Sequence, residues 1–418
     1  MQIQKIKGFA DILYPQSALY AMVEDIARTL FSRYMYREIR TPMIEYTELF
    51  VRGIGASTDV VQKEMYTFED KKSRSITLRP EATAGIVRAY IEHTIQGIAR
   101  VFTIGPMFRY ERPQKGRLRQ FHQINCECIG AEEPLVDAEI IAMLLRFLSA
   151  IGITDITLLL NSLGCTECRP HYKEVLLTYL HSVAETLCPT CQARMENNPL
   201  RVLDCKEESC IRHLKNAPSI TEYICTPCKE HFSEVQHTLD TLGISYTLTP
   251  RLVRGLDYYS RTTFEVVSNH IGAQSSIAGG GRYDTLIEEI GGKPTPAIGF
   301  ACGMERLILL LQQPSSLKTP FYIASLCPEA KTQALLLAEE LRTKGIGVEI
   351  SSGVVSIKQC MKYAGKYAQY CILLGEDELL QGKCSIKNMT TGIQEMISFD
   401  SCVEYCIQQE IVSPDKVF

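Results

Sequence analysis

Hydrophobic residues recur with two different periods along this chain of 418 residues. Between Leu19 and Tyr36 they return every three or four positions, which predicts a helix, and the step before Pro42 favours extended backbone. From Arg100 to Glu127 apolar and polar positions alternate, which predicts strands. The chain therefore combines helices with strands that have one polar face.

The alternating segment is a candidate hairpin with a polar surface. Its first strand carries Arg109 on the side opposite the apolar Phe102, and a charged connector follows at 111–117. A basic loop between two antiparallel strands is suited to contacting an RNA end. The second strand places four residues on one face, namely Phe121, Gln123, Asn125 and Glu127.

The rest of the chain changes character twice. Helical stretches and cysteine pairs dominate between Asn161 and Pro250, whereas strands and helices alternate after the linker-like 314–320. The alternation indicates a small doubly wound domain. We therefore expect an α+β protein with three parts: a body formed by 1–160 and 251–314, an inserted, mostly helical Cys-rich subdomain at 161–250, and an α/β domain at 320–418.

The amino-acid composition excludes some classes of protein but does not identify a single one. A hydrophobic share of 45% and a charged share of 22% are typical of a globular chain and exclude collagen-like or disordered ones. The net charge of -4 means that RNA would have to be bound by local basic patches. No apolar run is long enough to span a bilayer, so we expect a cytoplasmic protein without membrane contact.

Eight of the seventeen cysteines fall between Cys165 and Cys228. They form four closely spaced pairs, which are Cys165/Cys168, Cys188/Cys191, Cys205/Cys210 and Cys225/Cys228. Such spacing is typical of structural zinc sites, and eight thiolates could make two. Reduced packing cysteines and occasional disulfides remain alternatives, while a catalytic zinc is not expected so far from the other motifs.

Several short blocks follow one another in a specific order. They are Leu-Arg-Pro-Glu-Ala-Thr at 78–83, Phe-Arg-Tyr-Glu at 108–111, Arg-Gln-Phe-His-Gln at 119–123, Arg-Gly-Leu-Asp-Tyr-Tyr at 254–259, Gly-Gly-Gly-Arg-Tyr-Asp at 279–284 and Pro-Ala-Ile-Gly-Phe-Ala-Cys-Gly-Met-Glu-Arg-Leu at 296–307. Each alone has a plainer explanation: Glu81 could cap a helix, the glycines could form a tight turn, and Arg306 could belong to a packing helix. Taken in order, the blocks resemble the motifs of the histidyl-tRNA synthetase family of class II synthetases.

The resemblance implies a fold and a histidine site. The fold would be a catalytic domain with an antiparallel sheet flanked by helices, a helical insertion and a C-terminal α/β anticodon-binding domain. Glu127 would read the imidazole, and Gln123 would contact the amino end of the substrate. The remaining residues implied for histidine binding are Glu81, Ala82, Thr83, Tyr258, Tyr259 and Tyr283.

Activation of an amino acid brings its carboxylate against the α-phosphate of ATP, and negative charge then accumulates on phosphate oxygens. A planar, permanently charged guanidinium suits that charge, which makes Arg109 a candidate. The resemblance adds Arg254 at the α-phosphate, Arg306 at adenine and the γ-phosphate, and Phe121 stacked on adenine. It also leads us to expect the acceptor end of tRNA at three loop residues, Arg112, Gln114 and Arg117.

We therefore expect a homodimeric enzyme that activates L-histidine with ATP and Mg²⁺ and transfers it to tRNA(His). The dimer follows from the likeness of the first helix and strand to the family's interface motif. A rival is a non-catalytic relative that regulates histidine biosynthesis, but such proteins usually lack the arginine matching Arg254 and the anticodon domain. An inactive RNA-binding scaffold would not need an intact nucleotide and histidine pocket.

Overall fold

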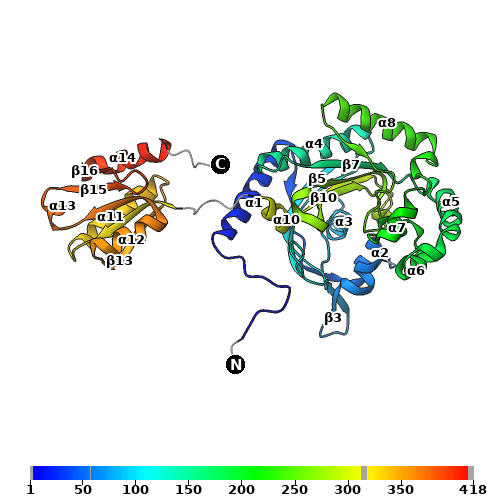
Figure 1. Cartoon of the computed structure of the whole chain (residues 1–418), viewed down its shortest axis with the longest axis horizontal. Helices are drawn as coiled ribbons and strands as arrows, with labels where there is room; N and C mark the ends of the chain where they lie inside the picture. The colour runs from blue at the N-terminus through cyan, green and yellow to red at the C-terminus, as the bar shows by residue number, and fades with distance from the viewer. Residues whose placement is uncertain (1–2, 57, 312–317, 413–418) are drawn as a thin grey trace. The chain divides into compact units, whose positions relative to one another are not determined.

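The computed structural model describes residues 3–56, 58–311 and 318–412. The chain forms two compact units, Met1–Gln312 and Gln313–Phe418, drawn in Figure 1. In the first unit the strands are β1 (Arg37–Glu38), β2 (Ile44–Tyr46), β3 (Tyr66–Glu69), β4 (Ser75–Leu78), β5 (Ala99–Phe108), β6 (Gln120–Ile129), β7 (Thr157–Ser162), β8 (Thr247–Leu248), β9 (Ser260–Val267), β10 (Ser276–Arg282) and β11 (Ala297–Gly303). The α-helices are α1 (Gln16–Arg33), α2 (Thr47–Ile54), α3 (Thr83–Glu92), α4 (Pro134–Ala150), α5 (Cys168–Ser182), α6 (Pro189–Asn197), α7 (Glu208–Leu214), α8 (Thr226–Thr241), α9 (Leu286–Glu289) and α10 (Met304–Leu310). Five shorter helical turns join them: η1 (Val60–Glu64), η2 (Ala184–Thr186), η3 (Pro199–Asp204), η4 (Ile220–Glu222) and η5 (Asn269–Gln274).

An eight-stranded sheet organises the first unit, in the order β1-β5-β6-β11-β10-β9-β7-β8. Its neighbours are antiparallel except for the pairs β1/β5 and β7/β8 at the two edges. Strands β5 and β6 form the expected hairpin, with Phe102 opposite Cys126 and Thr103 opposite Asn125. The antiparallel sheet flanked by helices confirms the expected fold class.

The two faces of this sheet bury different cores. Helices α1, α4, α8 and α10 cover one face, where Phe31, Phe147 and Phe300 are buried together with Cys126. In α1 the apolar residues follow the helical spacing seen in the sequence, although the helix ends at Arg33 rather than near Tyr36. The opposite face contacts α3, α9 and the insertion. The polar residues of β6 lie on this second face.

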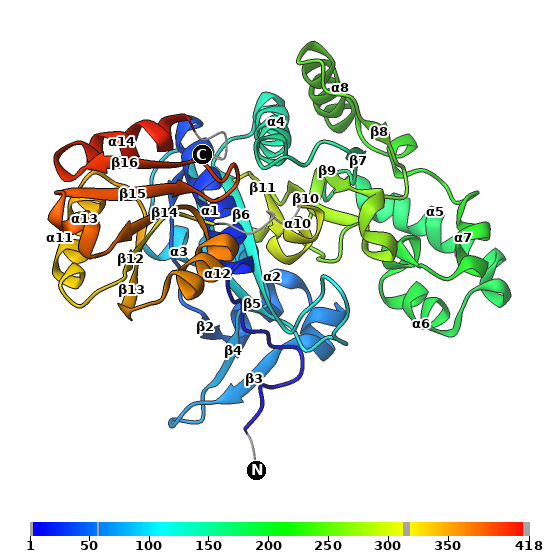
Figure 2. The same cartoon turned by 60° about the vertical axis from the view of Figure 1, so that its left-hand side comes forward.

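The insertion contains helices α5 to α8, and Figures 1 and 2 show α5, α6 and α7 grouped together on one side of the unit, away from α1. Two parts of the expected range 161–250 belong instead to the main sheet. Asn161 and Ser162 end β7, and Thr247 and Leu248 form the edge strand β8. None of the described helices combines the length and apolar character needed to cross a membrane.

The second unit is an α/β domain with helices on both faces of a mixed sheet. Its elements are β12 (Thr319–Ser325), α11 (Ala330–Thr343), β13 (Val348–Val354), α12 (Ile357–Tyr367), β14 (Ala368–Leu374), α13 (Glu376–Leu380), β15 (Lys383–Asn388), β16 (Gln394–Ser398) and α14 (Phe399–Val412). Helices α11 and α14 pack on one face and α12 on the other. The strand order is β13-β12-β14-β15-β16, and only the first three are parallel. The antiparallel strands β15 and β16 were not predicted from the sequence. Residues 314–317 of the expected linker 314–320 lie outside the described residues.

A buried ion pair connects the sheet to its covering helices. Arg282, at the end of β10, donates to Asp137 of α4 at 2.5 Å, and both side chains are fully buried. Arg282 also donates to the carbonyl of Ala131 at 2.6 Å, and a ring nitrogen of His231 on α8 lies 2.8 Å from the second Asp137 oxygen. These contacts satisfy two charges that could not be buried alone.

We predict that Arg282→Met lowers the stability of the first unit by about 3–5 kcal/mol, because Asp137 would keep its buried charge without its partner. Urea unfolding, followed by far-UV circular dichroism, measures this loss of stability. Arg212→Met, which removes an exposed pair with Glu208, is the control and should cost about 0–1 kcal/mol. Equal effects of the two substitutions would contradict the role of the buried pair.

Candidate active site

A cavity of about 400 Å³ opens on the polar face of the main sheet. It is lined by segments that lie far apart in the sequence, including β6, α10 and the turn before α3. Most of the residues singled out from the sequence line it: Glu81, Thr83, Arg109, Arg117, Phe121, Gln123, Glu127, Arg254, Tyr258, Tyr259, Tyr283 and Arg306. Ala82 is fully buried and does not line the cavity, and neither do the exposed Arg112 and Gln114.

Glu127 is the buried acid of this cavity. One carboxylate oxygen accepts a hydrogen bond from the Thr83 hydroxyl and the other from the Tyr283 hydroxyl, both at 2.7 Å. Burial raises the pKa of Glu127 to about 8, although the two hydroxyl groups favour the ionised form. A Cβ at Gly299 on the adjacent strand would lie 1.6 Å from this carboxylate, so only glycine fits there.

The Glu81 side chain caps the first turn of α3. Its carboxylate accepts hydrogen bonds from the backbone amides of Thr83 at 2.7 Å and Ala84 at 2.8 Å. The helix-capping interpretation therefore holds, and the same carboxylate also lines the cavity. Burial raises the pKa of Glu81, while the amide donors lower it.

Three tyrosines form one wall of the cavity. Tyr258 lies with its ring centroid 4.7 Å from that of Tyr259 and 5.7 Å from that of Tyr283. Near them, Gln123 Oε1 and Asn125 Oδ1 are buried and accept no hydrogen bond from any described residue. Buried polar atoms usually have partners, so these acceptors indicate that the cavity is built to receive hydrogen-bond donors.

Three arginines reach the cavity from different elements. Arg109 follows β5, donates to the Pro80 carbonyl at 2.8 Å and lies over the Phe121 ring, 5.5 Å from its centroid. Arg254 donates to Glu265 at 2.8 Å. Arg306 of α10 donates to the Ser276 carbonyl at 2.6 Å. The structure thus brings together positive charges that are separated by up to about two hundred residues in the sequence.

The glycine-rich block is part of β10 rather than a tight turn. A Cβ at Gly279 would lie 2.3 Å from an Arg254 guanidinium nitrogen, so the absence of a side chain makes room for that group. Arg282 at the end of the block faces away from the cavity, toward Asp137, whereas Tyr283 lines it. The block therefore helps to position two cavity residues: Gly279 leaves space for the Arg254 guanidinium, and Tyr283 itself lines the cavity.

The loop after β5 carries a second group of charges. Arg117 forms an ion pair with Glu111, and Gln114 and Arg117 are joined by backbone hydrogen bonds. Burial and the neighbouring Glu111 raise the pKa of Glu64 to about 7, while Arg109 lowers it. Carboxylates and guanidinium groups thus share this end of the cavity.

The insertion also contributes to the cavity, through residues that the sequence analysis did not identify. Arg194, Arg201 and Asp204 line it, as do Asp59 and Val60 of the segment before β3. Arg194 pairs with Asp59 at 2.5 Å, and Arg201 donates to the backbone carbonyl of Arg254 at 3.1 Å. No periodicity or motif marks these residues, because only the folding of the insertion over the sheet brings them close.

The eight cysteines of the insertion form two groups that could hold a metal ion. In each group the four sulfur atoms lie within 4.8 Å of one another, and among the described residues no other cluster of three or more ligand-type side chains meets this condition. The first group is Cys165, Cys168, Cys225 and Cys228, and the second is Cys188, Cys191, Cys205 and Cys210. Neither group lines the cavity.

We predict that Glu127→Gln becomes more stable relative to the wild type as the pH rises from 5 to 8. Below about pH 4.5 the carboxyl is protonated in both the native and the unfolded states, so the difference is constant. Above that pH the unfolded state releases the proton, whereas the native state keeps it until the pKa of about 8. Rising pH therefore penalises the wild type by at most about 4–5 kcal/mol.

Urea unfolding of both proteins at pH 5 and pH 8 measures this effect, with Glu196→Gln on the exposed surface of α6 as the control. A stability difference between Glu127→Gln and wild type that is the same at the two pH values would show that Glu127 titrates normally.

Comparison with known proteins agrees with this fold. Residues 8–307 match the family described as Histidyl-tRNA synthetase, and residues 320–409 match the family described as Anticodon binding domain. A protein of Nitratidesulfovibrio vulgaris strain DP4, named histidine--tRNA ligase, is 54% identical over 96% of this chain and 97% of its own length. A protein of the same name from Oleidesulfovibrio alaskensis is 54% identical over 96% of this chain and 98% of its own length.

A solved structure extends the agreement to three dimensions. The crystal structure of apo S. aureus histidyl-tRNA synthetase is 37% identical, with a TM-score of 0.79 over 97% of this chain and 99% of that one. The match covers both units and the insertion between β7 and β9. The chain therefore belongs to the histidyl-tRNA synthetase family.

Proposed function

We propose that this protein activates L-histidine with ATP to form histidyl-adenylate and pyrophosphate, and then transfers the histidyl group to the 3' end of tRNA(His). One observation carries the proposal: Arg109, Arg254 and Arg306 line the same cavity as the buried carboxylate of Glu127. Three positive groups suit a triphosphate, and a buried acid suits the imidazole of histidine.

The imidazole would bind between Glu127 and the tyrosine wall. Glu127 would accept a hydrogen bond from one ring nitrogen, and a hydroxyl of Tyr258 or Tyr259 would contact the other. A site that hydrogen-bonds both ends of a ring rejects analogues without those nitrogens by roughly 10⁴-fold or more. Since burial raises the pKa of Glu127 to about 8, the donors of the substrate would also stabilise its ionised form.

The other end of histidine would face Glu81, Thr83 and Gln123. The Gln123 amide oxygen lacks a partner among the described residues, which leaves it able to accept a hydrogen bond from the α-amino group. Glu81 places a carboxyl group in the same cavity. These contacts would direct the substrate carboxylate toward the arginines.

Adenylate formation needs positioning and charge more than a nucleophilic side chain. A carboxylate oxygen of histidine bonds to the α-phosphorus as the bond to the pyrophosphate oxygen breaks. Arg109 and Arg254 would stabilise the charge that develops on the α-phosphate oxygens. Phe121 and Arg306 would hold adenine, with Arg306 also near the γ-phosphate, and Mg²⁺ would enter as part of the ATP substrate.

In the second step a hydroxyl of the terminal ribose of tRNA attacks the histidyl carbonyl, and AMP leaves. Arg112 and Gln114 are exposed in the loop after β5, and Arg117 lines the cavity, so this loop could guide the acceptor end inward. The match of residues 320–409 to an anticodon-binding domain supports a second contact with the anticodon.

We also propose a cytoplasmic homodimer. Large apolar side chains are exposed in the first part of the chain, including Ile6, Leu13, Met43, Ile44 and Tyr46. An exposed apolar surface of this kind is typical of an interaction site. The same part of the chain contains the helix and strand that resemble the interface motif of the family.

The regulatory alternative is less well supported. Relatives named histidine--tRNA ligase align over 96% of this chain, including the α/β domain at the C-terminal end. Arg254 is present, and the cavity retains polar groups for both a nucleotide and an amino acid. The thiol clusters lie outside this cavity, so we assign them a structural role, with zinc as the metal.

The direct test is histidine-dependent exchange of labelled pyrophosphate into ATP. We expect exchange with L-histidine and none with other amino acids, because only an imidazole can form hydrogen bonds to both Glu127 and a tyrosine hydroxyl across the pocket. Neither a regulatory protein nor an RNA-binding scaffold catalyses this exchange. Its absence in a folded preparation that binds ATP and histidine would refute the proposed activity.

We further predict that Arg254→Ala lowers the rate of this exchange at least about 100-fold, since it removes a preorganised charge at the α-phosphate. The circular dichroism spectrum should stay unchanged. Arg146→Ala, at an exposed position of α4, is the matched control and should exchange normally. An Arg254→Ala rate close to that of the control would exclude the role given to Arg254.

A further inference from the structure

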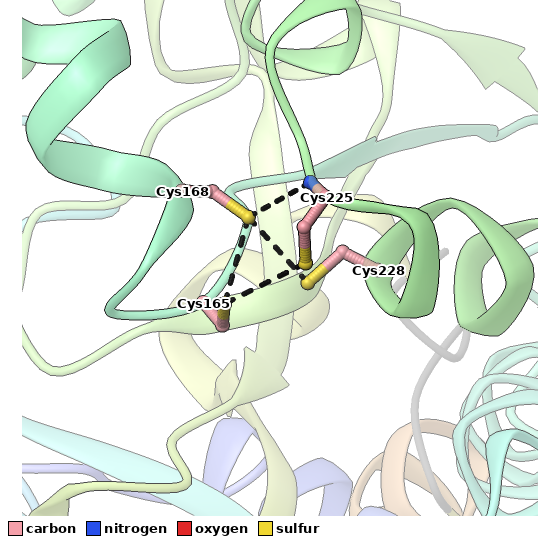
Figure 3. Close-up of side chains that lie close together, drawn as sticks. All are labelled: Cys165, Cys168, Cys225 and Cys228. Atoms are coloured by element: carbon pink, nitrogen blue, oxygen red, sulfur yellow. Dashed lines mark hydrogen bonds between the residues drawn. The ribbon is translucent and has the colours of Figure 1, made fainter.

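The two thiol clusters are nested, in a way that sequence spacing does not reveal. Cys165 and Cys168, at the start of α5, meet Cys225 and Cys228, at the start of α8, so the first and last cysteine pairs form the outer cluster (Figure 3). The two middle pairs form the inner cluster, which consists of Cys188, Cys191, Cys205 and Cys210. The inner cluster thus lies within the chain segment that the outer one closes.

The distances between sulfur atoms exclude disulfides and fit a metal ion. In the outer cluster three of them are 3.5, 3.9 and 3.8 Å, and in the inner cluster Cys188 and Cys205 are 3.9 Å apart. Four thiolates around one zinc ion, each at about 2.3 Å, would be separated by about 3.8 Å, whereas a disulfide needs about 2.05 Å. Cys360 and Cys371 in the second unit differ, because they form an isolated contact at 3.2 Å.

The backbone supports charged sulfur at both clusters. The amide of Cys225 donates to Cys168 Sγ at 3.0 Å, and the amide of Cys188 donates to Cys210 Sγ at 3.1 Å. Such donors stabilise metal-bound thiolates and orient them. Before the outer cluster, Gly164 has a φ of +64°, and a Cβ there would lie 2.8 Å from the Cys168 Cβ. The chain therefore turns closely around the first pair.

We propose that the insertion binds two zinc ions, each held by four thiolates, and that the inner ion positions the catalytic Arg254 from outside the active site. A tetrahedral set of four sulfur ligands with no open position is typical of structural zinc. The part concerning Arg254 rests on the proposed function. The binding of metal does not.

The outer zinc site would close the neck of the insertion. Next to it, the amide of Leu163 donates to the Arg261 carbonyl at 2.7 Å, and the amide of Arg261 donates to the Gly164 carbonyl at 2.9 Å. On the other side of the cluster α8 begins, and it packs along α4 of the main body. The ion would therefore join the two chain segments through which the insertion leaves and re-enters the catalytic body.

The inner zinc site would hold the segment that contacts the loop between β8 and β9, which carries Arg254 and is called the Arg254 loop below. Its ligands Cys191 and Cys205 flank residues 192–204, which include η3. From this segment the Asn198 amide donates to Asp257 at 3.1 Å, and Arg201 donates to the Arg254 carbonyl at 3.1 Å. Fixing both ends of the segment would fix these two contacts, and through them the backbone that carries Arg254.

Metal analysis of the full-length protein, purified with reductant and without added metal, tests the sites directly. We expect two zinc ions per chain, no iron, and eight thiols that react only after the zinc is released. Cys188→Ala/Cys191→Ala and Cys165→Ala/Cys168→Ala should each retain one zinc. Cys360→Ala/Cys371→Ala, which removes the isolated pair of the second unit, is the control and should retain two. A metal-free chain with eight freely reactive thiols, or with disulfides detected by mass, would overturn the proposal.

Pyrophosphate exchange tests the link to Arg254. The inner-site variant Cys188→Ala/Cys191→Ala should lose roughly tenfold or more in exchange rate. Asn198→Ala/Arg201→Ala should show a comparable loss while keeping both zinc ions, which separates the contact from the stability of the insertion. Normal exchange by this second variant would refute the positioning role even if the first variant failed to fold. A wild type with two zinc ions but no exchange would contradict the proposed function and leave the metal sites intact.

Discussion

The burial of Glu127 is the constraint around which the active site is built. A carboxyl group inside a protein is costly unless donors surround it, and here Thr83 and Tyr283 each donate at 2.7 Å. Meeting that need brings the turn before α3 and the end of β10 to the middle of β6. The adjacent strand must carry glycine at 299, since any side chain would collide with the carboxylate. The burial of Glu127 therefore requires that these four segments, which are distant in the sequence, pack together in this arrangement.

Close packing also explains how positively charged arginines come to lie beside Glu127. Gly279 leaves room for the guanidinium of Arg254, which is also held by Glu265 at 2.8 Å. Arg109 is fixed by the Pro80 carbonyl, in the turn that also carries Glu81. Because backbone groups and carboxylates hold these arginines in place, little rearrangement would be needed when phosphate charge develops. Rigid strands thus supply the preorganisation that phosphate chemistry requires.

Periodicity and motif order predicted the catalytic body well. The alternation in 100–127 identified the hairpin and its polar face, and the α+β fold class and the family were confirmed. The alternating strands and helices expected after the linker are also present, with α11 at Ala330–Thr343. Such features depend on local spacing, which a single sequence contains. The roles of individual site residues stay predictions, although most of those residues line one cavity.

Contacts made by folding could not be predicted in this way. Arg201 and Asn198 lie in a cysteine-rich segment without a motif, and they reach the Arg254 loop only because the insertion folds back over the sheet. The cysteine spacing likewise indicated two possible metal sites but not that the pairs are nested. Strands β15 and β16 were missed because each is short, with six and five residues, and their antiparallel pairing depends on the rest of the sheet. In each case tertiary packing decides, and no local pattern records it.

A crystal structure with a non-hydrolysable histidyl-adenylate analogue would show whether the buried acid and the arginines bind one ligand. We expect the imidazole to donate a hydrogen bond to Glu127 while the guanidinium groups of Arg109 and Arg254 contact the phosphate mimic in the same cavity. An analogue bound with its imidazole away from Glu127, or with its phosphate mimic out of reach of both arginines, would contradict it.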